Sequence, residues 1–255
     1  MVIKDELYGA FTDYLAAKDI KIMPEYISGC TLSDLSEEEV INKLYIIGEF
    51  HKKTMGYKGY MGLRLENKTG GTIEQYKVVI KRVKRYLKNI RMNGANSDFE
   101  RKLLRFAPAY IQRAENCISD IMKSGYMNII DRSMKRTEIC IGNISFQNID
   151  KTKGTIILNN INKCSYNNVE MDCFYFLSRC RRRELKLDYK KLTEEYCKYE
   201  ELEEESSKFI LAILSYPYEF IKCCNNYREK LKDCTEEEYE EKLDKAMLKD
   251  GEVLL

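Results

Sequence analysis

The residues best suited to chemistry lie in one stretch, residues 138–183. Two short apolar runs, residues 139–141 and 155–158, flank a polar segment that contains three candidates: Gly142, Asn143 and Asn148. Short β-branched runs of this kind predict strands joined by a loop. A helical pattern follows from Val169 onward. Because polar residues on a loop between buried strands often form a site, we expect the functional centre here.

This stretch resembles the catalytic centre of the aminoglycoside phosphotransferase and choline kinase group. That group carries His-Gly-Asp, four residues, Asn, a strand, Ile-Asp, and then Asp-Leu at the start of a helix. The corresponding segments here are Ile141-Gly142-Asn143, Asn148, Asn159-Asn160 and Asp172-Cys173. The resemblance implies that Asn143 occupies the position of the base. It also places Asn148 and Asn160 at the metal-ligand positions, and it retains Gly142 and Asp172.

Asn143 and Asn160 stand where the group has carboxylates. An amide cannot accept a proton from a hydroxyl nucleophile, and it offers a neutral oxygen where Mg²⁺ prefers a charged one. Phosphoryl transfer depends on metal-held charge and on positioning. We therefore expect a pseudokinase that is not an enzyme, with no catalytic residue, no metal and no cofactor. The alternative is a small-molecule phosphotransferase that uses Mg-ATP in an atypical site, or in a site completed by a second chain.

Five stretches of the chain resemble the CotS-like spore coat proteins of endospore-forming bacteria. They are residues 23–29 (MPEYISG), 48–57 (GEFHKKTMGY), 160–164 (NINKC), 172–179 (DCFYFLSR) and 214–220 (LSYPYEF). That family has a kinase-like fold, and its members are known as coat components. The resemblance implies a non-catalytic structural protein, made in the cytoplasm and assembled on the spore coat. Its partners would be other coat proteins or further copies of itself.

The predicted fold is mainly α with a small β element, like the large lobe of an aminoglycoside phosphotransferase-type kinase. A complete small lobe needs about 80–100 residues, and only residues 1–22 precede Met23, which lies just before the predicted hinge strand and turn at residues 25–29. One helix, residues 5–18, fits there, and a sheet does not. No glycine-rich phosphate loop occurs. We therefore divide the chain into a remnant N-terminal helix, residues 1–22, and a kinase-like C-terminal lobe, residues 23–255.

Periodicity and capping patterns predict eight further helices. They begin near residues 36, 72, 97, 172, 189, 206, 219 and 235. Capping boxes open those at Ser36, Ser97 and Thr235. Pro108 should kink the helix at residues 98–124, and Gly125 should cap the C-terminal end of that helix.

Two single residues are interpreted as structural. His51 ends the first of these helices beside an apolar face, where a histidine is typically a structural hydrogen-bond donor. Asp172 is placed to cap its helix or to brace the preceding loop. Four arginines end that same helix, where cations favour the helix dipole and need no ligand: Arg179, Arg181, Arg182 and Arg183.

The charge pattern bears on possible partners. The helix at residues 72–93 carries seven cations and no acid between residues 76 and 92, so nucleic-acid contact is one interpretation. A solvated or partner-facing helix is the other, and we favour it because the net charge of the chain is only +2. No apolar run has the length of a membrane span, and no secretory signal sequence begins the chain. We expect neither a nucleic-acid nor a membrane partner.

Ten cysteines and one histidine do not form a zinc pattern, since no pair has C-x-x-C spacing. The thiols are either reduced and buried or cross-linked late, in an oxidising coat. The nineteen tyrosines fit either a packed core or a cross-linked coat. The asparagines at residues 159–168 are interpreted as turn residues. A neutral pocket that binds a nucleotide without cleaving it is the alternative.

Overall fold

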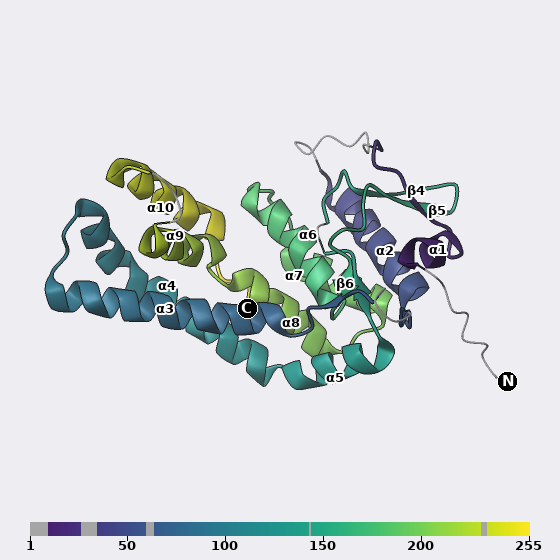
Figure 1. The fold of residues 1–255 in the computed structure, drawn as a ribbon, viewed down its shortest axis with the longest axis horizontal. Helices are drawn as coiled ribbons and strands as arrows, with labels where there is room; N and C mark the ends of the chain where they lie inside the picture. Colours follow the sequence, from purple (N-terminus) through teal and green to yellow (C-terminus); the bar gives the residue numbers. More distant parts are fainter. Residues whose placement is uncertain (1–9, 27–34, 60–63, 143, 231–233) are drawn as a thin grey trace.

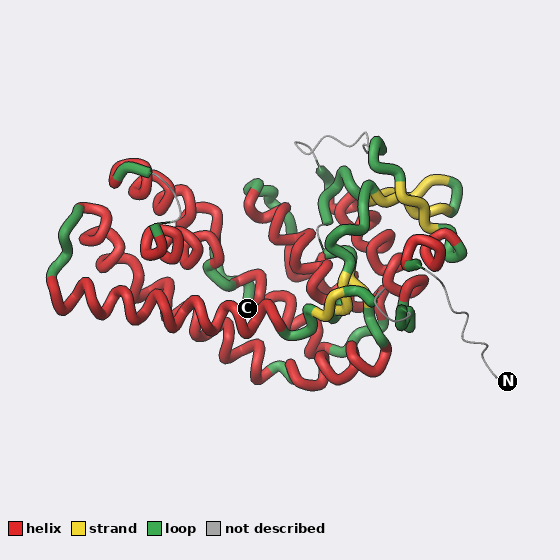
Figure 2. The backbone as a smooth tube through the Cα atoms, in the orientation of Figure 1, coloured by secondary structure: helices red, strands yellow, loops and turns green. Residues whose placement is uncertain are grey.

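The computed structural model describes residues 10–26, 35–59, 64–142, 144–230 and 234–255. This part of the chain is mostly helical, with short strands that form two small sheets (Figures 1 and 2). The helices are α1 (Phe11–Ala16), α2 (Glu37–Thr54), α3 (Gly71–Asn93), α4 (Asp98–Lys123), α5 (Tyr126–Arg136), α6 (Glu170–Arg182), α7 (Tyr189–Glu200), α8 (Glu204–Ser215), α9 (Tyr218–Glu229) and α10 (Glu236–Asp250). The prediction of a mainly α chain with a small β element is confirmed.

The long helices α3 and α4 lie side by side, and α9 and α10 pack against them at one end of the molecule (Figure 1). The buried residues of α3 follow a helical spacing: Ile73, Tyr76, Ile80, Val83, Leu87 and Ile90. Its cations lie on the opposite, outer face, as expected for an amphipathic surface helix. The predicted helix at residues 72–93 is therefore confirmed.

Helix α8 crosses the middle of the molecule and contacts α4, α6 and α7 (Figure 1). Its residues from Phe209 to Ser215 are all buried. A helix that is apolar on every side belongs in the interior. Helix α8 is therefore a buried helix that joins α4, α6 and α7.

The predicted N-terminal caps hold at Ser36 and Thr235, where both halves of the capping box are present. At Ser97 the hydroxyl accepts from the amide of Glu100, but the carboxylate of Glu100 accepts instead from the amide of Asn96 at 2.7 Å. Helix α4 continues through Pro108 to Lys123. After α4, Gly125 takes a positive φ of 76° and precedes α5, a helix that the sequence analysis did not predict.

Six strands among the described residues form two sheets, ordered β1-β5-β4 and β2-β6-β3. They are β1 (Ile20–Ile22), β2 (Glu66–Asn67), β3 (Ile139–Cys140), β4 (Ile149–Thr152), β5 (Thr155–Leu158) and β6 (Ser165–Tyr166). Strands β4 and β5 form an antiparallel hairpin. Lys153 and Gly154 turn it with positive φ, which suits a tight hairpin.

The apolar runs at residues 139–141 and 155–158 both contain strands, as predicted, but the segment between them holds a further strand, β4, and the two runs lie in different sheets. A strand, β1, also lies before Pro24, where only a helix was expected, because it pairs with the distant β5. Glu25 and Tyr26 are outside any strand, and the rest of the predicted hinge lies outside the described residues.

In the described part of the chain, nine cysteines are free thiols; Cys234 is half-buried and the other eight are buried. Burial raises the pKa of such thiols, Cys140 and Cys173 among them. This favours the interpretation of reduced, packed thiols. Tyrosines also stack in the core, for example Tyr110 on Phe220 with ring centroids 4.0 Å apart. No helix among the described residues combines the length and apolar character that crossing a bilayer requires.

Candidate functional site

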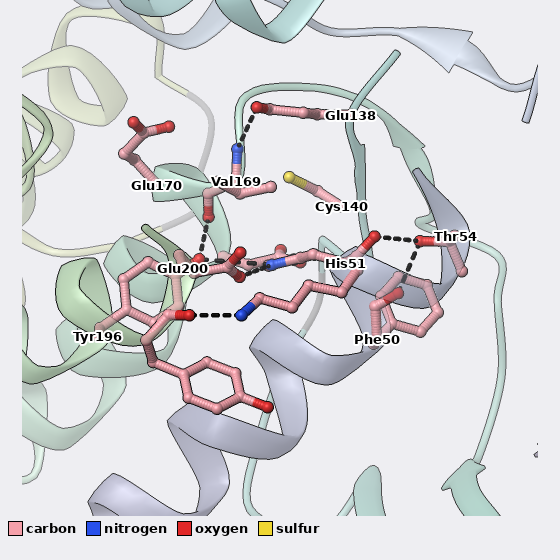
Figure 3. A network of polar contacts seen from close by, with 12 residues as sticks. Phe50, His51, Thr54, Glu138, Cys140, Val169, Glu170, Tyr196 and Glu200 are labelled. Atoms are coloured by element: carbon pink, nitrogen blue, oxygen red, sulfur yellow. Dashed lines mark hydrogen bonds and ion pairs between the residues drawn. The ribbon is translucent and has the colours of Figure 1, made fainter. Parts of the chain in front are cut away.

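A buried ion-pair network lies where α2, α6 and α7 meet (Figure 3). His51, in the last turn of α2, contacts a carboxylate with each ring nitrogen. Its Nε2 lies 2.9 Å from Asp172 Oδ2, and its Nδ1 lies 2.6 Å from Glu200 Oε1. The side chains of His51 and Asp172 are fully buried, and that of Glu200 is nearly so. Tyr196 lies beside this pair and donates to the carbonyl of Val169 at 2.8 Å.

The charge state of His51 follows from these contacts. Burial lowers its pKa, but the carboxylates of Glu200 and Asp172 outweigh that effect and raise the pKa to about 10. The imidazole is therefore doubly protonated at neutral pH and donates from both nitrogens. His51 acts as a fixed cation between two anions.

Asp172 also holds the candidate catalytic loop. Its Oδ2 accepts from the amide of Ile141 at 2.6 Å, and its Oδ1 accepts from the amide of Gly142 at 2.9 Å. Two hydrogen bonds from successive amides to one carboxylate fix the backbone of the loop just before Asn143. Asn143 itself lies outside the described residues. Asp172 therefore braces the loop; it does not cap α6 with a side-chain hydrogen bond.

Gly142 is required at its position by two constraints. Its φ of +85° is one that residues with a side chain rarely adopt. A Cβ there would also lie 2.5 Å from the carbonyl oxygen of Lys163. The loop and the segment before β6 therefore pack backbone to backbone.

A second buried network anchors the start of β3 and the start of α6. Arg132 lies 3.0 Å from Glu138 and 2.8 Å from Glu170. Ser206 donates to the same Glu170 carboxylate. Glu138 in turn accepts from the amide of Val169 (Figure 3). The sequence analysis did not identify this network, whose members come from α5, α6, α8 and the residue just before β3.

The side chains of His51, Cys140 and Asp172 place possible metal-ligand atoms within 4.8 Å of one another. A metal site needs a neutral imidazole and a thiolate. Here both ring nitrogens of His51 are occupied by carboxylates, and burial raises the pKa of Cys140 well above its usual value. These three residues therefore fit an ion-pair network and not a metal centre.

The family resemblance places Asn148 and Asn160 at the metal-ligand positions, but the structure does not bring these two side chains together. Asn148 Oδ1 accepts from the amide of Ser145 at 2.6 Å, and the carbonyl of Asn148 accepts from the amide of Asn159 at 3.1 Å. The Oδ1 of Asn159 is buried and has no hydrogen-bond partner among the described residues. Asn160 is exposed, and its Oδ1 accepts from Asn162. The structure thus pairs Asn148 with Asn159, and it turns Asn160 outward.

A buried carbonyl oxygen without a partner is costly unless another group satisfies it. Asn159 Oδ1 is such an atom, so a cation held there would fit. The oxygens offered by Asn148 and Asn159 are neutral amides, and Mg²⁺ prefers carboxylates. The pair therefore offers free Mg²⁺ only neutral oxygens, and one of them, Asn148 Oδ1, already accepts from the amide of Ser145.

A cavity of 480 Å³ opens beside the loop. Gly142 and Lys163 line it on one side, and residues of α6 and the α8–α9 junction line the other. The clamped loop therefore borders a space large enough for a small molecule.

Comparisons with known proteins point to one fold. No family model and no curated protein matches the chain. Among solved structures, an aminoglycoside phosphotransferase from Alicyclobacillus acidocaldarius superposes with a TM-score of 0.64 at 10% sequence identity. The match covers 90% of this chain and 65% of that one, so the chain spans about two thirds of its neighbour's length.

This match corrects one expectation and supports another. The prediction that the chain is not an enzyme is contradicted, since the protein that shares its fold is itself a phosphotransferase and points toward an enzyme. The membership of a spore coat family stays a prediction. At this low identity the likeness shows the fold, which is mostly helical with small sheets and kinase-like.

Proposed function

We propose that this chain is a phosphotransferase that acts on a small molecule, with Mg-ATP as the phosphoryl donor. The observation that carries the proposal is the clamp on the loop, in which Asp172 accepts from the amides of Ile141 and Gly142. The clamp fixes the backbone next to Asn143 at the edge of the 480 Å³ cavity. A molecule in that cavity would therefore meet a rigid loop at the position where the resembling enzymes carry out transfer.

Positioning is the main requirement for this chemistry. The transition state of phosphoryl transfer is loose, so an enzyme contributes mostly orientation and charge stabilisation. Asn143 cannot act as a base, and the loss of a general base costs about 10²–10⁴-fold in rate. We therefore propose slow transfer that relies on the fixed loop, with the hydroxyl of the acceptor oriented by the cavity.

Asn159 and Asn148 would hold the magnesium ion of Mg-ATP through their amide oxygens. The bound ion would supply charge neutralisation on the phosphates. The buried Asn159 Oδ1, which lacks a partner among the described residues, supports this role. Cationic His51 keeps Asp172 oriented toward the loop, and Glu200 holds His51 from the other side.

Calorimetric titration of the full chain with ATP tests the proposal. With Mg²⁺ present we expect saturable binding at millimolar or lower ATP, because the site offers neutral ligands and a preformed loop. With EDTA in place of Mg²⁺ we expect binding to weaken at least tenfold, since the asparagines contact the ion and not the phosphates. Silence up to several millimolar Mg-ATP would rule the proposal out.

We also propose a location for this activity: the spore coat, in contact with other coat proteins or with further copies of the chain. The support is the sequence resemblance, and three of its five stretches contribute His51, Asp172 and Tyr216, which build the network and the cavity. Eight of the nine cysteines in the described part of the chain are buried, which favours non-covalent contacts over cross-linking through those eight thiols.

Fluorescence microscopy of the tagged chain in a sporulating endospore former tests the location. We expect the signal to gather on the forming spore surface after a cytoplasmic phase. A signal that stays uniform in the mother cell until lysis would contradict the coat assignment and leave the proposed activity unaffected.

A further inference from the structure

The cavity beside the loop has an apolar floor and a charged rim. Phe174, Ile213 and Leu214 are buried and line it, together with Tyr76 at the start of α3. These side chains suit an aliphatic or aromatic body. The charges around this floor indicate what else the cavity would bind.

Cations dominate the rim. Six cationic side chains line the cavity: Lys68, Lys163, Arg179, Arg181, Arg182 and Lys249. Only two carboxylates do so, Glu219 and Asp250. A cavity with this excess of positive charge attracts anions and repels cations.

The carboxylates offset only part of this positive charge. Arg182 forms an ion pair with Glu219 at 3.4 Å, and Arg181 donates to the backbone carbonyls of Leu214 and Glu252. Asp250 accepts from the amides of Glu219 and Phe220 at 2.9 and 2.8 Å. One ion pair therefore forms within the lining, and the six cations of the cavity still outnumber its two carboxylates.

The arginines around the cavity also lower one another's pKa values, because their positive charges repel. Burial, followed by repulsion from Arg182 and Arg183, lowers the pKa of Arg179, and burial together with Arg113 lowers that of Arg181. An anion between these side chains would relieve both effects. Arg179 and Arg182 are half-buried, so their guanidinium groups can still reach a ligand in the cavity.

Tyr216 supplies an independent sign of a ligand. It is only 4% exposed, it lines the cavity, and its hydroxyl has no hydrogen-bond partner among the described residues. Its ring stacks on Tyr76 with centroids 4.2 Å apart, which fixes its orientation. A buried hydroxyl is normally satisfied by protein, water or ligand. The hydroxyl of Tyr216 is therefore a buried, unsatisfied donor on a residue that lines the cavity, and an acceptor atom of a ligand would satisfy it.

The helix α6 sets the length of the ligand. Asp172 clamps Gly142 at one end of the cavity, and Arg179 lies seven residues further along the same helix. At a rise of 1.5 Å per residue this separation is about 10 Å. Tyr175, Arg179 and Arg182 follow one another at three- and four-residue spacing, so they lie along one face of the helix.

We propose that this cavity binds a small organic anion about 10 Å long, whose carboxylate or phosphate group is held by Arg179 and Arg182. Its apolar body lies over Phe174 and Tyr76, and its other end lies at Gly142. The inference rests on the proposed function in one respect, namely that a hydroxyl at this other end is the phosphoryl acceptor. The sequence interpretation, in which these arginines needed no ligand, is replaced by this one.

Calorimetric titration with three matched probes tests the charge preference without nucleotide. The probes are 4-phenylbutyrate, 4-phenylbutanol and 4-phenylbutylamine, which share one body and differ in charge. We expect the carboxylate to bind at least tenfold more tightly than the alcohol, because a charge-assisted hydrogen bond to arginine is lost in the alcohol. Equal or tighter binding of the amine, or no binding of any anionic probe, would overturn the inference.

A second titration with phenyl phosphate distinguishes the two anionic groups. Tighter binding of phenyl phosphate than of 4-phenylbutyrate would assign a phosphate ester, and the reverse would assign a carboxylate. Either order supports the inference, since both groups are anionic.

Two variants identify the residues responsible. Arg179→Gln should weaken binding of the preferred anion about tenfold or more, since it removes a charged donor. Arg183→Gln is the matched control, because Arg183 is exposed and does not line the cavity. An equal effect of the two substitutions would mean that long-range charge, and not a site, causes the preference.

Tyr216→Phe separates a ligand role from a structural one. Removing a hydroxyl that has no partner should leave the thermal stability of the ligand-free protein unchanged or raise it. It should weaken anion binding severalfold. Unchanged anion binding in this variant would remove Tyr216 from the site.

The results of these measurements distinguish the anion-binding inference from the proposed function. Anion binding without any phosphoryl transfer would leave this inference standing and contradict the phosphotransferase. Transfer to a neutral or cationic acceptor, unaffected by Arg179→Gln, would do the opposite.

Discussion

His51 lies between Asp172 and Glu200, and its position shows how far single residues can be interpreted from sequence. The helical pattern of residues 36–51 predicts that His51 ends a helix near an apolar face. Its partners lie 121 and 149 residues away along the chain, so no local pattern indicates them. The same limit applies to Asn159 and Asn160: the sequence does not show which amide is buried, whereas the structure buries Asn159 Oδ1 and exposes Asn160.

The protonation state of His51 gives a prediction that a single NMR experiment can check. Because His51 is the only histidine in the chain, its ring ¹⁵N signals need no assignment. We expect both nitrogens to stay protonated through pH 9 in the folded protein, since its pKa is raised to about 10. In urea the same residue should titrate near pH 6.5, the unperturbed value. A neutral tautomer at pH 7 in the folded state would contradict the network.

The same shift fixes a pH dependence of stability. The folded pKa of about 10 lies above the unfolded value, so the contribution of His51 is fully present below about pH 6.5. It is lost as the pH rises toward 10. Urea unfolding should therefore show a free energy of unfolding that falls between pH 6.5 and 8.5, by on the order of 1 kcal/mol per pH unit. Constant stability over this window would argue against a cationic His51.

Asn159 and Asn160 allow a matched test of the metal position. Asn159→Asp places a carboxylate at the buried, unpartnered oxygen, and it should strengthen binding of Mn²⁺ with ATP by about tenfold or more, since these ions prefer charged oxygen ligands. Asn160→Asp adds the same charge at an exposed neighbour and should change little. Water proton relaxation with Mn²⁺ in place of Mg²⁺ measures both. Stronger binding of Mn²⁺ with ATP in the Asn160→Asp variant alone would support Asn160, and not Asn159, as the metal ligand.

At the scale of elements, local signals predicted the helices well and the sheets poorly. Capping residues such as Ser36 and Thr235 act within one helical turn. Amphipathic spacing depends on residues of a single helix, so both signals can be recognised in a local stretch of sequence. Strand pairing joins distant segments, such as Ile20 with Ile156, and no local pattern shows it. Helix α5 was missed because it follows directly on Gly125, which was interpreted as the end of a helix.

The loop before Asn143 yields a prediction at this scale. Gly142→Ala should destabilise the protein by about 3 kcal/mol or more, because it combines a positive φ with a Cβ 2.5 Å from the carbonyl of Lys163. Gly56→Ala is the control: its φ is also positive, but a Cβ there meets nothing within 4 Å. Backbone strain alone should cost it about 1–2 kcal/mol. Equal losses in urea unfolding would mean that the close approach of loop and β6 segment is relieved by small shifts.

At the scale of the whole molecule, the C-terminal segment closes the cavity. Arg113 donates to the carbonyls of Ser215, Asp250 and Gly251, so it joins α4 to the end of α8 and the end of α10. The carboxylate of Asp250 accepts hydrogen bonds from the amides of Glu219 and Phe220 at the start of α9. The cavity is therefore assembled from segments spread from Lys68 to Asp250, which explains why the sequence did not reveal it.

The shared fold extends over 90% of this chain and 65% of the aminoglycoside phosphotransferase. A phosphotransferase for cationic substrates would need an acidic cavity, whereas the cavity here is lined mainly by cations. The clamp on the loop supports the proposed phosphoryl transfer, and the charge of the cavity supports the proposed anionic acceptor. Fold and substrate are therefore separate conclusions, which need separate tests.

The most direct test of the central claim is transfer of labelled γ-phosphate from Mg-ATP to a pool of hydroxyl compounds that includes hydroxy acids, sugar phosphates, neutral alcohols and amino alcohols. The full chain is incubated with the pool, and new phosphate esters are separated and counted. Our account predicts a slow, Mg²⁺-dependent ester product that is confined to anionic acceptors and greatly reduced by Gly142→Ala. Mg-ATP that yields no ester above the protein-free control with any acceptor would contradict it.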